Sequence, residues 1–132
     1  MSIIFNKWNL LKENQGLRQD ALEILEAGYA AIDTEKILKS KITLEEDQTI
    51  CIQDTGFQCN FYERIFFIGI GKCAFDGAKV IEDILGDRLT DGVVIDVRAG
   101  ILKKIRSYQG THPYPSEMNI SATRQILQMI KG

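Results

Sequence analysis

The segment IFFIGIGKCAFDG, residues 65–77, limits the possible folds of this chain more than any other feature. The run RIFFIGIG is typical of a strand that is buried on both faces of a sheet. After Lys72, apolar residues recur at helical spacing until Gly86, and GVVIDV at residues 92–97 follows as a second apolar run. Strand, helix and strand in this order predict a βαβ unit with a right-handed crossover, and therefore a parallel sheet.

Helical patterns come before this unit. Residues 5–15 predict a short helix that ends at Gly16. A longer helix follows, and its predicted packing face consists of Leu17, Ala21, Leu25, Gly28 and Ile32. The segment TEKILKSK, residues 34–41, predicts another short helix.

Strand patterns are weaker in the rest of the chain. ITL at residues 42–44 and TICI at residues 49–52 predict two short strands, with a hairpin turn at Asp54 and Gly56. Residues 101–111 alternate loosely and predict one or two edge strands.

A C-terminal helix is predicted to start at Ser116 and to turn Ile120, Leu127 and Ile130 inward. Taken together, these patterns predict an α/β, Rossmann-like three-layer domain with a short, mostly parallel sheet and an N-terminal helical segment. We expect residues 1–132 to form a single domain, because this length suits one hydrophobic core.

Charge and hydropathy exclude several classes of protein. Sixteen basic and eighteen acidic side chains leave a net charge of -2, so we predict no general affinity for nucleic acid or anionic membranes. No apolar run approaches the ~18 residues that a membrane-spanning helix needs, and the N-terminus lacks the pattern of a signal peptide.

The cysteines predict a reducing environment. The chain has three cysteines without CxxC spacing, which indicates free thiols and a cytoplasmic location. Cys51, Cys59, Cys73 and His112 have atoms that bind zinc but lack the spacing of a zinc site, so we predict no metal site. A nucleophilic role for Cys73 is disfavoured, because no base lies near it in the sequence.

The turn between the first strand and its helix is a candidate phosphate-binding site. Gly69 and Gly71 permit a tight bend and a close approach of a ligand to the backbone. The first N–H groups of the helix lack partners within the helix, and its dipole favours an anion there. Lys72 adds a positive charge at the same place. A P-loop is excluded, because Phe66 is five residues before Gly71 and Cys73 follows Lys72.

Two other kinds of site stay open from the turn alone. A dinucleotide turn fits Gly69-x-Gly71-x-x-Ala74, with Asp96 as a candidate ribose acceptor, although Lys72 lies where the pyrophosphate would approach the backbone. The second kind is the strand–glycine–lysine–helix turn of sugar-phosphate isomerase domains.

The segment GTHPYPSEMN, residues 110–119, is the second candidate site. It contains His112, which is the only histidine of the chain, directly before Pro113. Pro113 and Pro115 stiffen the segment and favour extended conformations in the residues before them. Ser116 is placed to cap the helix that follows. Free N–H groups of that helix and the imidazole would therefore line the same loop.

With both segments in view, the chain resembles the N-terminal part of the type II glycerate 2-kinases, the family whose later segment is the MOFRL domain. The likeness covers LRQDALEILEAGYAAID at residues 17–33, the long segment IFFIGIGKCAFDGAKVIEDILGDRLTDGVVI at residues 65–95, and GTHPYPSEMNISATRQIL at residues 110–127. The order and spacing of these three pieces make the resemblance specific.

The resemblance implies an activity and a set of site residues. The implied reaction transfers the γ-phosphoryl group of ATP to the 2-hydroxyl of D-glycerate, with Mg²⁺. Lys72 matches the lysine that is taken to be essential in that family, and His112 belongs to its His-Pro-x-Pro loop. The implied binding residues beside the catalytic Lys72 are Gly69, Gly71, Cys73, Thr111, His112, Pro113 and Ser116.

The chain departs from the family pattern in residues and in length. Alanine is frequent where Cys73 stands, and an acidic residue where Ser116 stands. Family members are several times longer and continue into a glycine- and serine-rich phosphate loop and a MOFRL-type domain, which residues 1–132 lack. We therefore expect a fragment, a truncated gene product or a half-enzyme that needs a complementing second half. The alternatives are a sugar-phosphate isomerase-like binding domain and a non-catalytic assembly module that forms homodimers through a sheet edge.

Overall fold

The computed structural model describes residues 16–131. Its contacts divide the chain into two compact units, residues 1–33 and residues 34–132. The expectation of a single domain over residues 1–132 remains a prediction. None of the helices in the described residues is long and apolar enough to cross a membrane.

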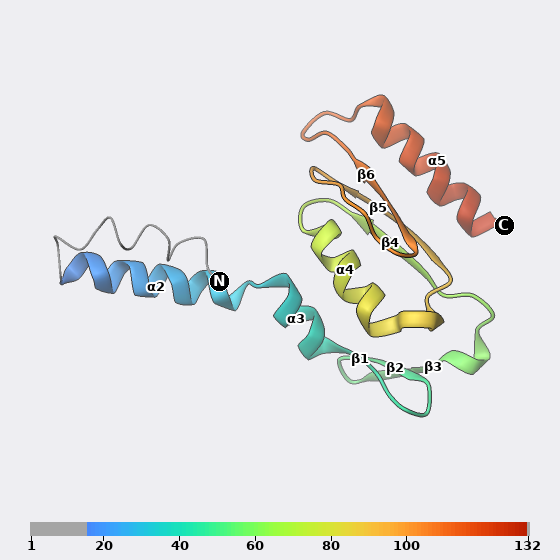
Figure 1. Ribbon diagram of the computed structural model, residues 1–132, viewed down its shortest axis with the longest axis horizontal. Helices are drawn as coiled ribbons and strands as arrows, with labels where there is room; N and C mark the ends of the chain where they lie inside the picture. The colour runs from blue at the N-terminus through green and yellow to red at the C-terminus, as the bar shows by residue number, and fades with distance from the viewer. Residues whose placement is uncertain (1–15, 132) are drawn as a thin grey trace. The chain divides into compact units, whose positions relative to one another are not determined.

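The described part of the first unit is one helix, α2 (Leu17–Ala31), drawn in blue in Figure 1. Its predicted packing face is not buried, because Leu17, Leu25 and Ile32 are 89%, 48% and 67% exposed. The prediction of an inward face is therefore wrong for these three residues. The helix predicted at residues 5–15 lies outside the described residues.

The second unit begins with a helix and a small antiparallel sheet. These elements are α3 (Thr34–Lys41), β1 (Ile42–Leu44), β2 (Thr49–Ile52) and β3 (Thr55–Gln58), with the strands in the order β1-β2-β3. The sequence predicts α3, β1 and β2 but misses β3. Asp54 lies in the hairpin turn as predicted, whereas Gly56 is paired with Cys51 inside the sheet. A short 3-10 helix, η1 (Cys59–Phe61), follows.

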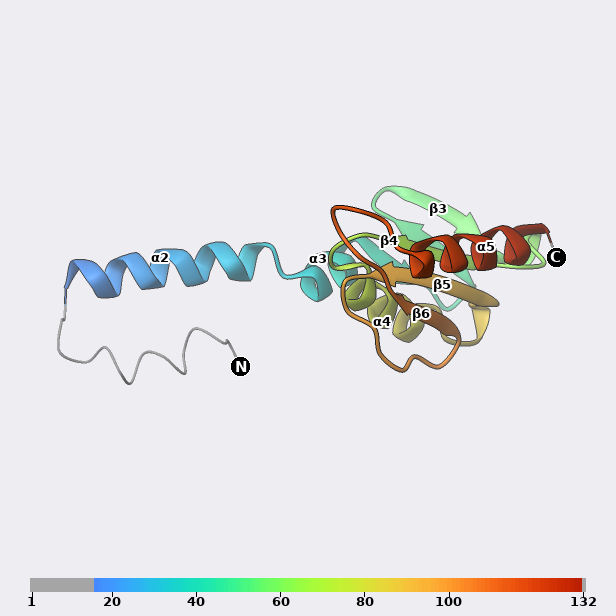
Figure 2. The same cartoon turned by 90° about the horizontal axis from the view of Figure 1, so that it is seen from above.

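The core of the second unit is a parallel sheet between two helices. Its strands are β4 (Phe66–Ile70), β5 (Asp91–Asp96) and β6 (Ile105–Gln109), in the order β4-β5-β6. The helix α4 (Ala74–Leu85) and the 3-10 helix η2 (Gly86–Arg88) connect β4 to β5, and α5 (Glu117–Lys131) follows β6. The two helices lie on opposite faces of the sheet (Figure 1, Figure 2). This confirms the predicted α/β three-layer fold with a parallel sheet and an N-terminal helical segment.

Each face of the parallel sheet has its own apolar cluster. The cluster on the α4 side includes Ala78, Ile81, Leu85, Val94 and Ile105, and that on the α5 side includes Val93, Ile95, Ala122, Ile126 and Met129. Neighbouring residues of a strand point to opposite faces, so Val93 and Val94 are both fully buried. The second apolar run of the sequence is therefore a buried strand, as predicted, and it lies at the centre of this sheet.

Two predictions about burial are wrong. β4 is an edge strand, and its Ile68 and Ile70 are 43% and 71% exposed, so it is not buried on both faces. In α5 the inward residues are Ala122, Ile126 and Met129, whereas the predicted Ile120, Leu127 and Ile130 are each about half exposed. The helix has apolar residues on two faces, and the small Ala122 allows one of them to pack closely against the sheet.

The buried carboxylate of Glu82 joins α4 to the start of β6. Its Oε1 accepts hydrogen bonds from the N–H groups of Lys104 at 2.6 Å and Ile105 at 2.8 Å, and its Oε2 accepts one from the Lys103 N–H at 2.9 Å. Burial acts to raise the pKa of Glu82, but the three backbone donors outweigh it, so the pKa is lowered. The ionised carboxylate therefore fixes the start of the third strand.

Candidate functional site

A pocket of about 490 Å³ lies where the parallel strands end. Three segments line it: the turn after β4, the end of β5, and the loop between β6 and α5. The lining residues are Ile70, Gly71, Lys72, Ile95, Asp96, Val97, Gly110, Thr111, His112, Pro113, Pro115 and Asn119. Ligands of open α/β sheets bind at the carboxyl ends of the strands. This pocket is therefore the candidate functional site.

Backbone hydrogen bonds hold the turn between β4 and α4. The Gly71 N–H donates to the Ile95 carbonyl oxygen at 2.9 Å, and the Ala74 N–H donates to the Gly71 carbonyl oxygen at 3.1 Å. Gly71 has a φ of 106°, a conformation that favours glycine. Cys73 has a φ of 67°, which is uncommon for a residue with a side chain. The resulting tight bend brings Lys72 into the lining of the pocket.

Gly69 has a packing role in this turn region. It is buried within β4, and a Cβ atom there would lie 2.9 Å from Cε1 of Phe67 and 3.1 Å from Cγ2 of Val94. Both atoms are on side chains that fill the core around the sheet. A larger residue would therefore disturb the packing between β4 and β5. The binding role predicted for Gly69 remains a prediction.

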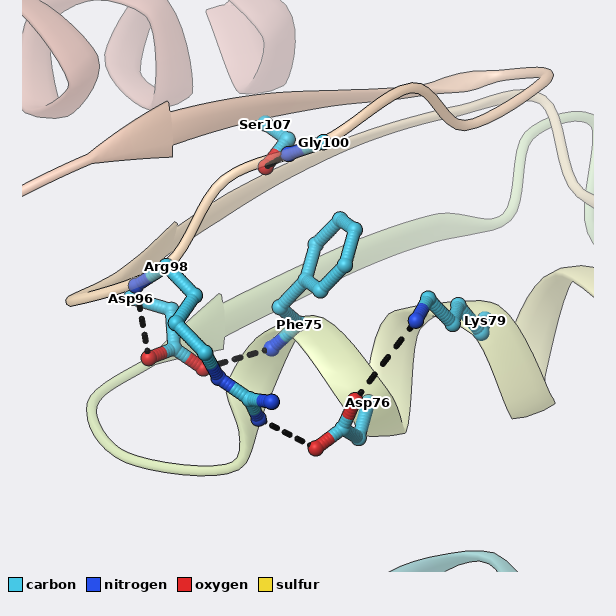
Figure 3. Close-up of polar contacts among 7 residues, drawn as sticks. All are labelled: Phe75, Asp76, Lys79, Asp96, Arg98, Gly100 and Ser107. Atoms are coloured by element: carbon cyan, nitrogen blue, oxygen red, sulfur yellow. Dashed lines mark hydrogen bonds and ion pairs between the residues drawn. The ribbon is translucent and has the colours of Figure 1, made fainter.

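A buried carboxylate occupies the N-terminal end of α4. Asp96 is 3% exposed, and its Oδ2 accepts a hydrogen bond from the Phe75 N–H at 2.9 Å (Figure 3). Its Oδ1 accepts one from the Arg98 N–H at 3.3 Å. The N-terminal end of α4, where the helix dipole favours an anion, is thus already occupied by a carboxylate of the protein itself. As expected, the Phe75 N–H has no partner within the helix, but Asp96 of β5 occupies it. This capping role disfavours Asp96 as a free ribose acceptor.

The cations beside α4 are paired with another carboxylate. The Arg98 guanidinium donates a hydrogen bond to Asp76, and Nζ of Lys79 lies 3.7 Å from Oδ1 of Asp76 (Figure 3). The hydrogen bond to Asp76 and then the charge of that carboxylate raise the pKa of Arg98. Arg98 and Lys79 are therefore already occupied by a partner within the chain.

Lys72 is a cation without such a partner. Its side chain is exposed and makes no hydrogen bond or ion pair with any residue that the structure describes. The backbone N–H groups of Lys72 and Cys73 likewise have no partner among residues 16–131. An ammonium group and two N–H groups on one bend are suitable donors for the oxygens of a carboxylate or a phosphoryl group.

The loop of residues 110–116, which we call the His112 loop, contributes a further part of the pocket lining. Oδ1 of Asn119, in the first turn of α5, accepts hydrogen bonds from the N–H groups of Thr111 and Ser116, each at 3.0 Å. The Ser116 hydroxyl donates to the same oxygen at 2.9 Å. These bonds hold both ends of the loop, and His112 lies between them.

Gly110 permits a close contact at the start of this loop. A Cβ atom at Gly110 would lie 2.7 Å from Nδ2 of Asn119 and 2.8 Å from Cγ2 of Ile95. The Gly110 N–H donates to the Asp96 carbonyl oxygen at 2.8 Å, so the β-type contact continues past the end of β6. A glycine at this position therefore allows the His112 loop to start directly beside β5.

Five of the eight site residues predicted from the sequence line the pocket. These are Gly71, Lys72, Thr111, His112 and Pro113, whereas Gly69, Cys73 and Ser116 are outside its lining. Cys73 precedes α4 and Ser116 bonds to Asn119, so both adjoin the pocket. The sequence reasoning missed Asn119, although the Ser116-x-x-Asn119 spacing resembles a capping box and could have indicated it.

The acidic and sulfur-containing side chains of the described region do not form a metal cluster. Within residues 16–131, no three His, Cys, Asp or Glu side chains come together in a way that would hold a metal ion. Cys51, Cys59 and Cys73 are free thiols.

Residues 20–132 match the protein family described as a domain of unknown function, DUF4147. A glycerate 2-kinase from Pyrococcus horikoshii is 26% identical over 117 residues, which are 86% of this chain and 25% of that protein. A D-glycerate 2-kinase from Thermotoga maritima is 30% identical over 71 residues, which are 52% of this chain and 17% of that protein.

A solved structure supports the same relationship. The crystal structure of the PH0495 protein from Pyrococcus horikoshii matches with a TM-score of 0.73 and 25% identity, over 89% of this chain and 26% of that one. The present chain thus spans about a quarter or less of the length of these relatives.

Proposed function

Because this chain belongs to the DUF4147 family and matches the N-terminal part of proteins named glycerate 2-kinase, we propose that it forms one side of an ATP-dependent glycerate 2-kinase site. The proposed reaction transfers the γ-phosphoryl group of ATP to the 2-hydroxyl of D-glycerate. The observation that supports this most is Lys72, which lines the pocket at the carboxyl ends of the parallel strands and has no ion-pair partner among residues 16–131.

The donors of the pocket suit this chemistry. Phosphoryl transfer depends on holding the reactants in line and on stabilising the charge of the transferred group. Lys72 and the two N–H groups of its bend would bind carboxylate or phosphoryl oxygens, because they have no other partner among the described residues. His112, on the His112 loop, would contact the polar groups of glycerate.

ATP and Mg²⁺ are the cofactors that the proposal requires. Mg²⁺ usually takes one or two protein carboxylates together with phosphate oxygens and water. Asp96 is the one carboxylate among the lining residues of this pocket, and both its oxygens already accept hydrogen bonds from backbone N–H groups. We therefore expect the carboxylates that hold the ion to come from the complementing second half. When bound, Mg²⁺ would neutralise part of the charge on the phosphoryl oxygens.

The complete site would need more polypeptide than this chain provides. Family relatives are more than three times as long. The described surface includes an open sheet edge at β4 with exposed Ile68 and Ile70. A complementing second half, or a second copy of the chain, would cover such an edge. The free thiols fit a reducing compartment, and we propose a cytoplasmic location on that ground.

A titration of the isotope-labelled chain tests the proposal. We expect D-glycerate to shift the amide NMR signals of Gly71, Lys72, Thr111 and His112, because these residues line the pocket. We expect ATP with Mg²⁺ to shift signals of the same turn. Binding of glucose 6-phosphate with no response to ATP and Mg²⁺ would favour the isomerase-like alternative instead. No response to any of the three ligands would contradict both binding proposals.

A further inference from the structure

We infer that Asn119 is a positioning residue that holds the His112 loop against the pocket. Its side chain is partly buried and belongs to the pocket lining. Oδ1 of Asn119 is a shared acceptor for two backbone N–H groups, those of Thr111 and Ser116, both at 3.0 Å. The Ser116 hydroxyl donates to it at 2.9 Å, whereas the Thr111 hydroxyl donates to the Tyr114 carbonyl oxygen at 2.6 Å and lies 3.3 Å from Oδ1 of Asn119.

These contacts join the two ends of the His112 loop. Thr111 directly precedes His112, and Ser116 follows Pro115, so one oxygen atom closes the segment between them. A helix cap alone would require only the contacts with Ser116. The contacts with Thr111 do nothing for α5, because Thr111 is near the start of the loop and not next to the helix. Asn119 therefore acts on the loop as well as on the helix start.

His112 depends on this closure for its place. Its side chain is exposed and makes no hydrogen bond with any residue in the described part of the chain. The amide of Asn119 also lies against Gly110, where an added Cβ atom would be 2.7 Å from Nδ2. Loss of the Asn119 amide would thus remove the acceptor that both ends of the loop share and the group that lies against Gly110. The consequence for ligand binding rests on the proposed function, whereas the consequence for the loop does not.

Three variants of the full chain test this inference. Asn119→Ala removes the shared acceptor. Asn119→Asp keeps carboxylate oxygens that accept the same hydrogen bonds. Thr123→Ala is the matched control, because Thr123 lies one turn further along α5 and its Oγ1 donates only to the Asn119 carbonyl oxygen, at 2.8 Å. The measurements are amide hydrogen exchange, the ring NMR signals of His112, and the affinity for D-glycerate.

We expect Asn119→Ala to speed exchange at the Thr111 and Ser116 amides about tenfold, the scale of one lost hydrogen bond. The ring signals of His112 should shift or broaden, while the amides of Val93 and Val94 in the core stay protected. Asn119→Asp should restore slow exchange in the loop but bind D-glycerate weakly, because its charge lies in the pocket lining with Lys72. Thr123→Ala should match the original chain.

The outcomes separate this inference from the proposed function. Exchange and ring signals unchanged in Asn119→Ala would overturn the inference, as would a loss of protection that extends equally to the core strands. If the loop responds as expected but the chain does not bind D-glycerate, the role of Asn119 is upheld and the glycerate proposal is contradicted.

Discussion

Replacing Lys72 with alanine is expected to weaken the binding of D-glycerate to this chain by about 10- to 100-fold. A hydrogen bond to a charged group contributes about 1.5–3 kcal/mol, and Lys72 is the lysine of the pocket lining. The variant should keep its fold, because the Lys72 side chain makes no hydrogen bond or ion pair with the described residues. Calorimetric titration measures the affinity, and thermal unfolding followed by circular dichroism checks the fold.

The matched control for this variant is Lys103→Ala. It removes the same charge from a side chain that is 82% exposed and lies at the beginning of the segment leading into β6, at the other end of the sheet. Its ion pair with Asp83 is 3.9 Å long and exposed, so little stability should be lost. An equal loss of affinity in both variants would show that net charge, and not the position of Lys72, determines binding.

Replacing Glu82 with glutamine is expected to lower the free energy of unfolding by about 3 kcal/mol. The change removes the charge and one of two oxygens that together accept three backbone hydrogen bonds, from Lys103, Lys104 and Ile105. A buried donor left without a partner costs about 1–3 kcal/mol. Urea unfolding at neutral pH measures the difference.

The pH dependence gives an independent test of the role of Glu82. Because the folded state lowers its pKa, the stabilisation is fully present above the usual glutamate pKa of about 4.3 and is lost as the pH falls through the lower, folded value. The difference in stability between the original chain and Glu82→Gln should therefore shrink in acid. Asp83→Asn is the control, since this neighbouring carboxylate is 65% exposed. A difference that stays constant down to strongly acidic pH would contradict the role assigned to Glu82.

Much of the fold could be predicted because its main elements have strong local patterns. The apolar run, the glycine pair and the helical spacing up to Gly86 indicate a βαβ unit, and the structure has one at β4, α4 and β5. The errors concern properties that depend on distant neighbours. Whether β4 is central or at an edge depends on which strands pair with it, and its own sequence does not contain that information. The inward face of α5 was missed because apolar residues occur on two of its faces.

The candidate site could be predicted in part for a related reason. Lys72 and His112 belong to separate segments, but both follow parallel strands, and the carboxyl ends of such strands meet at one edge. The roles of Asp96 and Asn119 could not be predicted equally well. Each acts by accepting hydrogen bonds from backbone groups whose positions are known only in the folded chain. An isolated Asp or Asn in a sequence has many such possible partners.

The most direct test of the proposed kinase site uses an exchange of segments. The matching N-terminal quarter of the Pyrococcus horikoshii glycerate 2-kinase is replaced by residues 20–132 of this chain, with either Lys72 or Lys72→Ala. We predict that the folded hybrid with Lys72 phosphorylates D-glycerate from ATP and that the alanine hybrid is slower on the order of 10²–10³-fold. A folded hybrid without activity, or equal rates for the two hybrids, would contradict the proposal.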